Sequence, residues 1–370
     1  MINTVPLTPG QLLPCLETLH ALKMPAYLHG APGIGKSSII RDFAAQKGLK
    51  LEVLILSQIE AADLRGLPAL DAISKRTTWY PPEFLPSDGA GILFLDELSA
   101  AEPRLQVAAY QLILDRRVGD YQLPPDWWVV GAGNAPDDGA ISFDMGSALS
   151  DRLVHFKVVP SAREWIVWGQ NHRIAPEVLA FIQVKPDFLE SNGLQQQNGQ
   201  LIGPTPRSWE RVSRVIEREN SRATREFLVA GIVGEAASAE FFLVLEELAD
   251  LAPIEDILSA AGEKNAGEKN GHEKLDAMLP RTLAGLYGLT YSLTATVSDV
   301  ESARATMRVL IRVGEIEDAP GAALPRAEVQ ALAMELLLER AAKRGFLLEL
   351  GETPEYEIYR ETARQIVEIN

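Results

Sequence analysis

The sequence predicts an α/β fold, a three-layer sandwich in which helices cover both faces of a five-stranded parallel sheet, followed by helices alone. Two observations predict it. Apolar runs of strand length alternate with helical stretches as far as Pro160, as expected of parallel β-α units. Beyond Pro160 only helical periodicity remains. The expected parts are an α/β core at 1–160, an α-helical lid at 161–260 and a helical C-terminal extension at 273–370.

The first half of the core begins with a helix for which Thr8 is a suitable N-cap. A strand over 25–29 and a helix over 37–47 flank a glycine-rich stretch, and a second apolar run at 51–56 predicts another buried strand. Residues 57–88 do not fit a simple β-α unit. We therefore expect a helix interrupted by an inserted hairpin or loop, which is a common place for function.

The second half of the core contains the other three strands. They are expected at 92–95, 127–134 and 154–159. Pro103 suits the first turn of the helix that follows the first of these strands. A hairpin is expected over 117–124, turning at Gly119, and a short helix over 147–152.

The rest of the chain has helical patterns. In the lid they cover 161–171, 176–189, 208–219 and most of 224–251, and in the extension 273–290, 298–313, 327–344 and the tail from Thr353. Between the two parts, a polar pentapeptide occurs twice over 261–270, which is typical of a linker rather than of a repeat architecture.

Composition limits the classes of function. The formal net charge of -16 and the absence of a Lys/Arg run make nucleic acid and anionic lipid unfavoured partners. A single cysteine, Cys15, excludes intrachain disulfides and thiolate zinc clusters. No apolar stretch reaches the roughly 18 residues of a membrane span, and the N-terminus lacks the pattern of a signal peptide. We expect a cytoplasmic protein without membrane contact.

The glycine-rich stretch Gly30–Ser37 matches the phosphate-binding pattern G-x-x-x-x-G-K-[ST] in full. Its glycines allow backbone N–H groups to turn toward a polyphosphate. Lys36 can reach the β- and γ-phosphates, and the Ser37 hydroxyl can bind Mg²⁺. The alternative, a chance glycine-rich turn, fits the strand–loop–helix context poorly.

Two carboxylates follow the apolar strand at 92–95. Asp96 and Glu97 lie where that strand ends, which is the edge at which open α/β sheets bind ligands. Asp96 is expected to hold Mg²⁺ through its water shell, and Glu97 to orient and polarise the attacking water. Asn134 ends a neighbouring strand, and its amide is expected to position the same water. Two ordinary acidic residues at a strand end are the alternative.

These motifs, in this order, resemble an AAA+ ATPase of the MoxR group, which is related to magnesium-chelatase and dynein-type modules. The resemblance covers residues 9 to 220 and rests on the segments GAPGIGKS, ILFLDE, DRRVGDYQLP, VVGAGN and ALSDRLVHF. It implies that 63–88 is an insert in helix 2 and that 117–124 is the hairpin before sensor 1. The family's Asn-Arg pair after the second acid is absent here, and Arg104, Arg116 and Arg117 are the candidates to replace it.

The resemblance assigns roles residue by residue. The nucleotide-binding positions are Gly30, Ala31, Pro32, Gly33, Ile34, Gly35, Lys36, Ser37 and Ser38. Asp96 and Glu97 match the Walker B pair, and Asn134 matches sensor 1. Arg152 matches an arginine finger that acts on the neighbouring subunit's γ-phosphate; a structural ion pair is its alternative. Arg207 matches sensor 2 at the start of a lid helix; a solvated arginine is its alternative.

The implied function is ATP hydrolysis with Mg²⁺ in a homo-oligomeric, hexameric ring that remodels or activates a protein client. Relatives often act with a von Willebrand A-domain partner. Two other interpretations remain: a nucleic-acid-dependent motor, which the acidity disfavours, and a nucleotide-gated scaffold with little turnover.

Overall fold

The computed structural model describes residues 4–71, 73, 76–134, 151–191, 202–249, 251–262, 269–316 and 324–369. The chain forms two compact units. The first, the sheet unit, consists of Met1–Trp165 with Leu189–Ser208, and the second, the helical unit, of Ile166–Phe188 with Trp209–Asn370. Among the described residues, no helix is long and apolar enough to cross a membrane.

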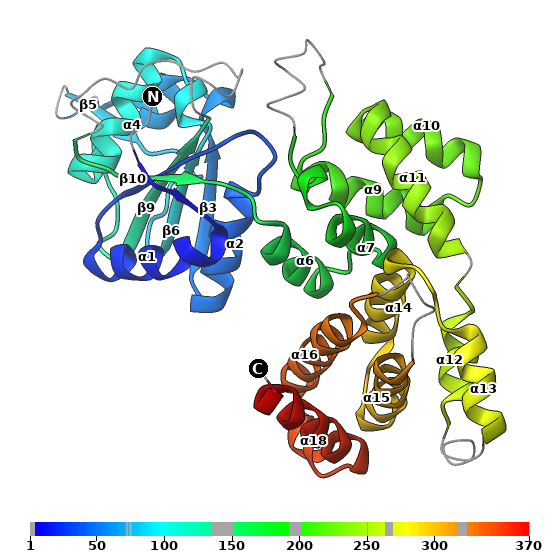
Figure 1. Ribbon diagram of the computed structural model, residues 1–370. Coiled ribbons are helices and arrows are strands. Elements are labelled where there is room, and N and C mark those ends of the chain that lie inside the picture. Colours follow the sequence, from blue (N-terminus) through cyan, green and yellow to red (C-terminus); the bar gives the residue numbers. More distant parts are fainter. Residues whose placement is uncertain are drawn as a thin grey trace. The chain divides into compact units, whose positions relative to one another are not determined.

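A parallel sheet forms the centre of the sheet unit (Figure 1). The five predicted strands are confirmed as β2 (Ala26–His29), β3 (Lys50–Ile55), β6 (Gly91–Asp96), β9 (Trp127–Gly133) and β10 (Val154–Val158). The predicted number is wrong by one, because β1 (Pro6–Leu7) pairs with β10 and the order is β1-β10-β2-β9-β6-β3. A strand of two residues is too short to show a hydrophobic period, so the sequence pattern did not reveal it.

Helices cover both faces of this sheet, as predicted. Ile92 and Phe94 of β6 belong to a core with α1 (Pro9–Leu22) and α2 (Lys36–Lys47). Leu93 and Leu95 belong to a second core with α3 (Ala61–Arg65) and α4 (Pro103–Asp115). Successive side chains of a strand point to opposite faces, so a buried run such as β6 requires a helical layer on each side.

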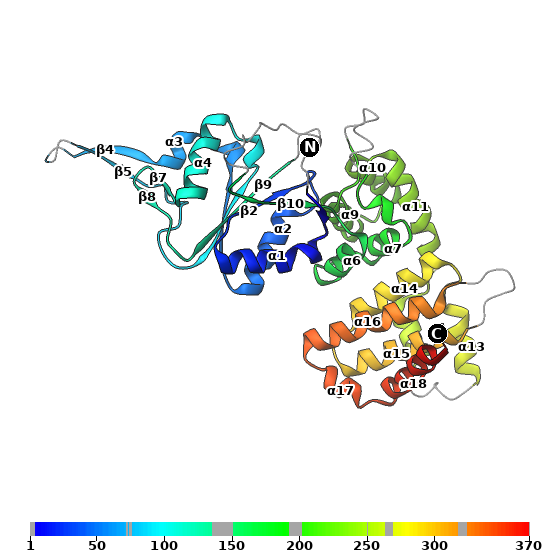
Figure 2. The same cartoon turned by 60° about the vertical axis from the view of Figure 1, so that its left-hand side comes forward.

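The region between β3 and β6 contains the expected insert. After the 3₁₀ turn η1 (Leu56–Gln58) and α3, the strands β4 (Leu67–Asp71) and β5 (Arg76–Tyr80) form an antiparallel hairpin (Figure 2). The second expected hairpin is β7 (Arg117–Val118) with β8 (Tyr121–Gln122). A further 3₁₀ turn, η2 (Leu98–Ala100), follows β6. The predicted short helix at 147–152 lies outside the described residues, except for its last two.

The helical unit contains the predicted helical stretches, but two of them are interrupted, and two short helices at 254–260 and 347–351 were not predicted. Two helices, α6 (Ala162–Asn171) and α9 (Pro206–Arg218), begin in the sheet unit and end in the helical unit. The other elements of the helical unit are α7 (Pro176–Val184), η4 (Pro186–Phe188), α10 (Arg222–Val233), α11 (Glu235–Ala249), α12 (Ile254–Ala260), α13 (Lys269–Met278), α14 (Leu283–Thr296), α15 (Val300–Glu315), α16 (Arg326–Arg344), α17 (Leu347–Gly351) and α18 (Pro354–Ile369). The stretch 224–251 forms two helices that meet at Gly234, which has a φ of 88°. The stretch 273–290 is interrupted at Pro280, which cannot continue a helical hydrogen-bond ladder.

The expected lid and extension pack against each other within the helical unit. α14 contacts both α7 and α11, and the Tyr291 hydroxyl on α14 donates to the Gln183 side chain on α7 at 2.9 Å. A large apolar core joins α12 to α17. These contacts explain why residues of both expected parts form one compact unit.

Candidate functional site

The phosphate-binding loop lies between the end of β2 and the start of α2. Gly33 and Gly35 have φ values of 83° and 101°, in the left-handed region that a side chain disfavours. A Cβ on Gly33 would lie 2.8 Å from the Thr205 hydroxyl. The loop therefore needs glycine at Gly33 for two reasons, its backbone conformation and the close approach of Thr205.

Lys36 is buried in the first turn of α2, with 8% of its surface exposed. Its ammonium donates to the carbonyl oxygens of Gly30 and Ala31 in the loop itself. It also donates to the side-chain oxygen of Asn134 at 3.1 Å. The structure thus brings the predicted lysine and the predicted strand-end amide into direct contact.

Ser37 and Asp96 meet across the sheet edge. The Ser37 hydroxyl donates to a carboxylate oxygen of Asp96 at 2.6 Å. Hydroxyl and carboxylate oxygens are the hard ligands that Mg²⁺ prefers, and this ion usually takes only one or two from the protein. The pair fits such a site, and no group of three or more His, Cys, Asp or Glu side chains suited to a metal occurs among the described residues.

Glu97 follows directly and has a strained backbone. Its φ of 56° is left-handed, which is uncommon for a residue with a side chain and is often found at functional positions. The Glu97 N–H donates to the Asp96 carboxylate at 2.9 Å. The exposed Glu97 carboxylate accepts a hydrogen bond from the hydroxyl of Ser57. This backbone turn and this hydroxyl hold the carboxylate in one orientation.

A histidine pair, of which His29 is buried and His155 partly exposed, lies beside the loop. His29, the last residue of β2, is 2.7 Å from His155 of β10, measured between ring nitrogens, and the rings are stacked. Burial, together with the nearby His155 and Lys36, lowers the pKa of His29 to about 3. Burial also raises the pKa of the neighbouring Tyr27 above its ordinary value. His29 and Tyr27 are thus both neutral near pH 7 and add no charge beside the loop.

Arg207 lies next to the loop through its backbone. Its N–H donates to the carbonyl of Gly33 at 3.1 Å, and its side chain is exposed at the start of α9. Thr205 and Ser208 bond to each other's backbone and side chain and shape this turn. The structure therefore brings the predicted sensor position to the phosphate loop.

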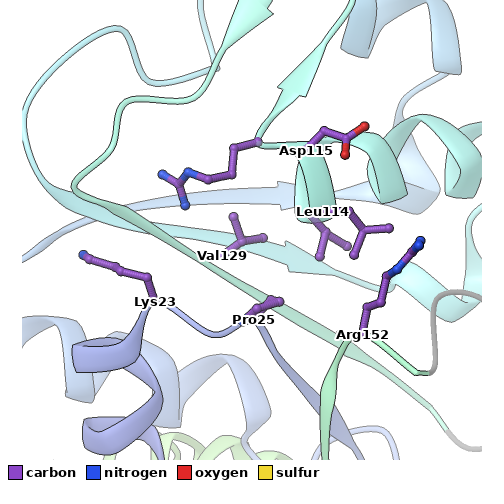
Figure 3. A pocket seen from close by; sticks show the side chains of 8 residues that line it. Lys23, Pro25, Leu114, Asp115, Val129 and Arg152 are labelled. Carbon is purple, nitrogen blue, oxygen red and sulfur yellow. The ribbon is translucent and has the colours of Figure 1, made fainter.

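Arg152 lies at the other edge of the sheet. It precedes β10, which starts beside the start of β2, whereas the loop follows the end of β2. Five strand residues at about 3.3 Å each separate the two edges by roughly 15 Å. The exposed Arg152 lines a cavity of about 430 Å³ together with Lys23, Leu114 and Asp115, and its side chain extends alongside Leu114 (Figure 3). The structure does not bring Arg152 together with the other predicted site residues.

Three hydroxyl residues of the site were missed by the sequence analysis. Ser57 holds Glu97, Ser99 accepts from the N–H of Asn134 at 3.0 Å, and Thr205 covers Gly33. Ser57 had one usable signal, since it follows a predicted strand as Asp96 and Asn134 do. Ser99 and Thr205 had none, because isolated hydroxyl residues carry no pattern.

Arg116 was one candidate to replace the absent Asn-Arg pair. Its guanidinium instead donates to the carbonyls of Pro124 and Trp127 at 2.6 and 2.8 Å. Burial lowers its pKa from the ordinary value. These bonds hold Arg116 against the segment between β8 and the start of β9.

Residues 25–153 match the sequence profile of the AAA domain, dynein-related subfamily. The match begins just before β2 and ends just before β10, so it includes the loop, Asp96, Glu97, Asn134 and Arg152. This segment has the fold of an AAA-type P-loop domain. No curated protein matches the sequence.

The comparison with solved structures found several similar chains, with low TM-scores. A putative ATPase from Cytophaga hutchinsonii is 12% identical, with 90% of each chain covered and a TM-score of 0.34. NtrX from Brucella abortus, solved in complex with ADP, is 16% identical, with 88% of this chain and 68% of that chain covered and a TM-score of 0.39. The Thermotoga maritima RuvB Holliday junction branch migration motor is 17% identical, with 84% and 89% covered and a TM-score of 0.35.

Proposed function

We propose that this protein is an ATP-hydrolysing AAA+ protein that uses hydrolysis to remodel or activate a partner protein. One observation carries the proposal. Lys36, Ser37 with Asp96, Glu97 and Asn134 come from separate segments and converge at the carboxyl edge of one parallel sheet. Hydrolysis of a triphosphate needs this set: a phosphate cation, metal ligands, a group that activates water and a group that positions it.

Nucleotide binding follows from the loop. The backbone N–H groups of Gly33 and Gly35 and the N-terminus of α2 favour a polyphosphate. The Lys36 ammonium is already oriented by loop carbonyls and can exchange these neutral oxygens for charged phosphate oxygens. Ser37 and Asp96 are the residues that would hold Mg²⁺, which neutralises charge on the phosphates when bound.

Water activation is assigned to Glu97. Its carboxylate is exposed at the strand end and can accept a proton from water, while the Asn134 amide orients that water. Ser57 is a positioning residue, because it acts through the Glu97 carboxylate.

If Arg152 takes part in hydrolysis, neighbouring copies of the chain must associate in a ring. Its edge of the sheet lies roughly 15 Å from the phosphate loop of the same chain, so it can reach a γ-phosphate only on a neighbouring copy. Such an arginine stabilises charge on the transferring phosphoryl group. We propose a hexamer, the state that the resemblance implies, with ATP between subunits.

Arg207 provides the connection to the helical part. Its N–H holds Gly33, and its side chain starts α9, whose later residues belong to the helical unit. A change at the phosphates can therefore be transmitted along α9. The proposed client is a protein, for which a von Willebrand A-domain protein is the candidate that the resemblance offers.

Three experiments test the proposal. Purified protein should bind ATP with Mg²⁺ in calorimetry and release phosphate steadily; binding without turnover would support a nucleotide-gated scaffold instead. Arg152→Ala and Lys36→Ala should each be inactive alone and regain activity when mixed, because one supplies an intact loop and the other an intact arginine. Clear stimulation by DNA or RNA at moderate salt would contradict a protein client and favour a nucleic-acid motor.

A further inference from the structure

The helical unit contains a second cavity that the proposed ATPase site does not use. Its volume is about 540 Å³, within the range of small-molecule sites. The end of α6, the start of α7, α9, α14 and α16 line it. All of these lining residues belong to the helical unit, so the cavity lies within one compact body.

The charged groups around this cavity are mostly cations. Arg173, Arg340, Lys343 and Arg344 line it, against the two carboxylates of Glu217 and Glu339. A local excess of positive charge is unusual in a chain whose formal net charge is -16. It raises the local concentration of anions.

Most of these cations also have structural contacts. Arg340 donates to the carbonyls of Ala295 and Val297, and Lys343 to the side-chain oxygen of Asn171 at 3.1 Å. Lys343 and Arg344 lie in the last turn of α16, where the helix dipole favours a positive charge. These residues therefore supply charge to the cavity, but a structural role explains each of them.

Arg173 is different. It has a φ of 58° in the turn after α6, a left-handed conformation that glycine usually takes and that costs a residue with a Cβ some free energy. Its side chain is exposed and makes no hydrogen bond or ion pair with any described residue. An arginine in a strained position without a structural contact is a hypothesis of function.

A second donor beside Arg173 also lacks an acceptor. The side-chain nitrogen of Gln170 is buried and has no hydrogen-bond partner among the described residues, although a buried polar atom without one is costly. Burial and the nearby Arg344 lower the pKa of Arg340, as expected for cations held close together. An anion in the cavity would accept hydrogen bonds from Arg173 and Gln170, and its negative charge would reduce the repulsion between Arg340 and Arg344.

The remaining lining is apolar. Ile174, Leu179 and Leu336 contribute aliphatic surface, and Tyr291 contributes a ring that is 1% exposed. We propose that this cavity binds a small organic anion, a carboxylate or phosphate carried by an apolar body, with Arg173 and Gln170 as the anion-binding residues. The site is separate from the phosphate loop, so the ligand is an effector or a second substrate rather than the nucleotide.

Anilinonaphthalene sulfonate is a suitable probe, because it joins an aromatic body to an anionic group and becomes fluorescent in apolar sites. The full chain should bind it, and Arg173→Gly should bind it about tenfold more weakly, the effect of losing one charged hydrogen bond. The same change should not lower the midpoint of thermal unfolding, because glycine relieves the left-handed strain. A purely structural arginine would instead lower that midpoint.

Two controls complete the test. Arg281→Ala removes an equal charge from an exposed position in the helical unit outside this cavity and should leave the dye affinity unchanged. Phenylnaphthylamine, the uncharged counterpart of the dye, should bind wild type and Arg173→Gly equally. The proposal is wrong if wild type does not bind the sulfonate, if Arg173→Gly binds it as wild type does, or if the uncharged dye or Arg281→Ala shows the same loss.

Discussion

Lys36 in the sheet unit and Glu355 in the helical unit are both buried charged residues, and their surroundings differ. The Lys36 ammonium bonds to two backbone carbonyls and one amide oxygen, which orient it but carry no full charge. The Glu355 carboxylate, on α18, bonds to the guanidinium groups of Arg304 at 2.9 Å and Arg308 at 2.6 Å on α15. A charge oriented by neutral groups is suited to bind a charged ligand, whereas a charge bonded to opposite charges joins two helices.

This difference leads to opposite expectations. Changes at the phosphate-loop edge should alter nucleotide chemistry with little effect on stability. Changes at the Glu355 cluster should alter stability with little effect on the chemistry.

The largest effect is expected for Glu97→Gln. An amide can still accept the bond from Ser57 but accepts a proton from water poorly, so hydrolysis should fall about a thousandfold while ATP binding persists. Phosphate release and calorimetry measure the two quantities. Glu83→Gln, at an exposed position of the same unit, is the control and should behave as wild type. Equal hydrolysis by Glu97→Gln and wild type would remove Glu97 from the mechanism.

The next effect is expected for Glu355→Gln, which leaves two arginines facing a neutral amide. The free energy of unfolding should fall by about 3 kcal/mol, as for other broken buried pairs, with ATPase activity per folded molecule retained. Denaturant unfolding measures it. Glu357→Gln on the same helix breaks an exposed contact to Arg360 and should change stability by less than about 0.5 kcal/mol.

The same cluster predicts a dependence on pH. Burial would raise the pKa of Glu355, but the hydrogen bonds from Arg304 and Arg308 outweigh it and lower the pKa below the ordinary value of 4.5. Glu355 therefore stabilises the fold fully above about pH 4.5, and this contribution is lost as the pH falls. Unfolding curves of wild type and Glu355→Gln should converge between pH 5 and pH 3 (about the range over which carboxyl groups protonate). If the difference in stability between the two proteins stays constant over this range, protonation of Glu355 does not contribute to the loss of stability in acid.

Lys36→Ala should weaken ATP binding about a hundredfold, because it deletes the main phosphate cation. The midpoint of thermal unfolding should change little, since the oxygens of Gly30, Ala31 and Asn134 can accept from water. The matched control is Lys47→Ala, at the other end of α2. It breaks an exposed ion pair with Glu17 of α1 and should bind ATP normally. A large loss of stability in Lys36→Ala would contradict the expectation that changes at the phosphate-loop edge have little effect on stability.

The smallest effect is expected for Ser57→Ala. Glu97 loses the hydroxyl that orients it, so the hydrolysis rate should fall by about tenfold while the affinity for ATP stays the same. Ser57→Thr keeps the hydroxyl and should restore the wild-type rate. If both variants lose activity equally, Ser57 contributes through packing and not through its hydrogen bond.

Much of the sheet unit could be predicted from local patterns. The loop match and the apolar strands placed Lys36, Ser37, Asp96 and Asn134 at one edge, and the contacts Ser37–Asp96 and Lys36–Asn134 confirm that they meet. In the helical unit, periodicity identified helical stretches but not all of their breaks. Pro280 interrupts one predicted helix and Gly234 another. Those breaks depend on single residues that a period averages over.

The phosphate loop, the strand ends that carry polar side chains and the alternation that requires a parallel sheet can all be recognised in the sequence, because each of these is local along the chain. Which of these local features meet depends on the packing of the folded chain. The pairing of β3 with β6 puts Ile55 opposite Asp96 and so brings Ser57 to Glu97, and the start of α9 returns to cover Gly33. Strand order and helix packing are fixed by contacts between residues far apart in the chain, and no spacing in the sequence records them.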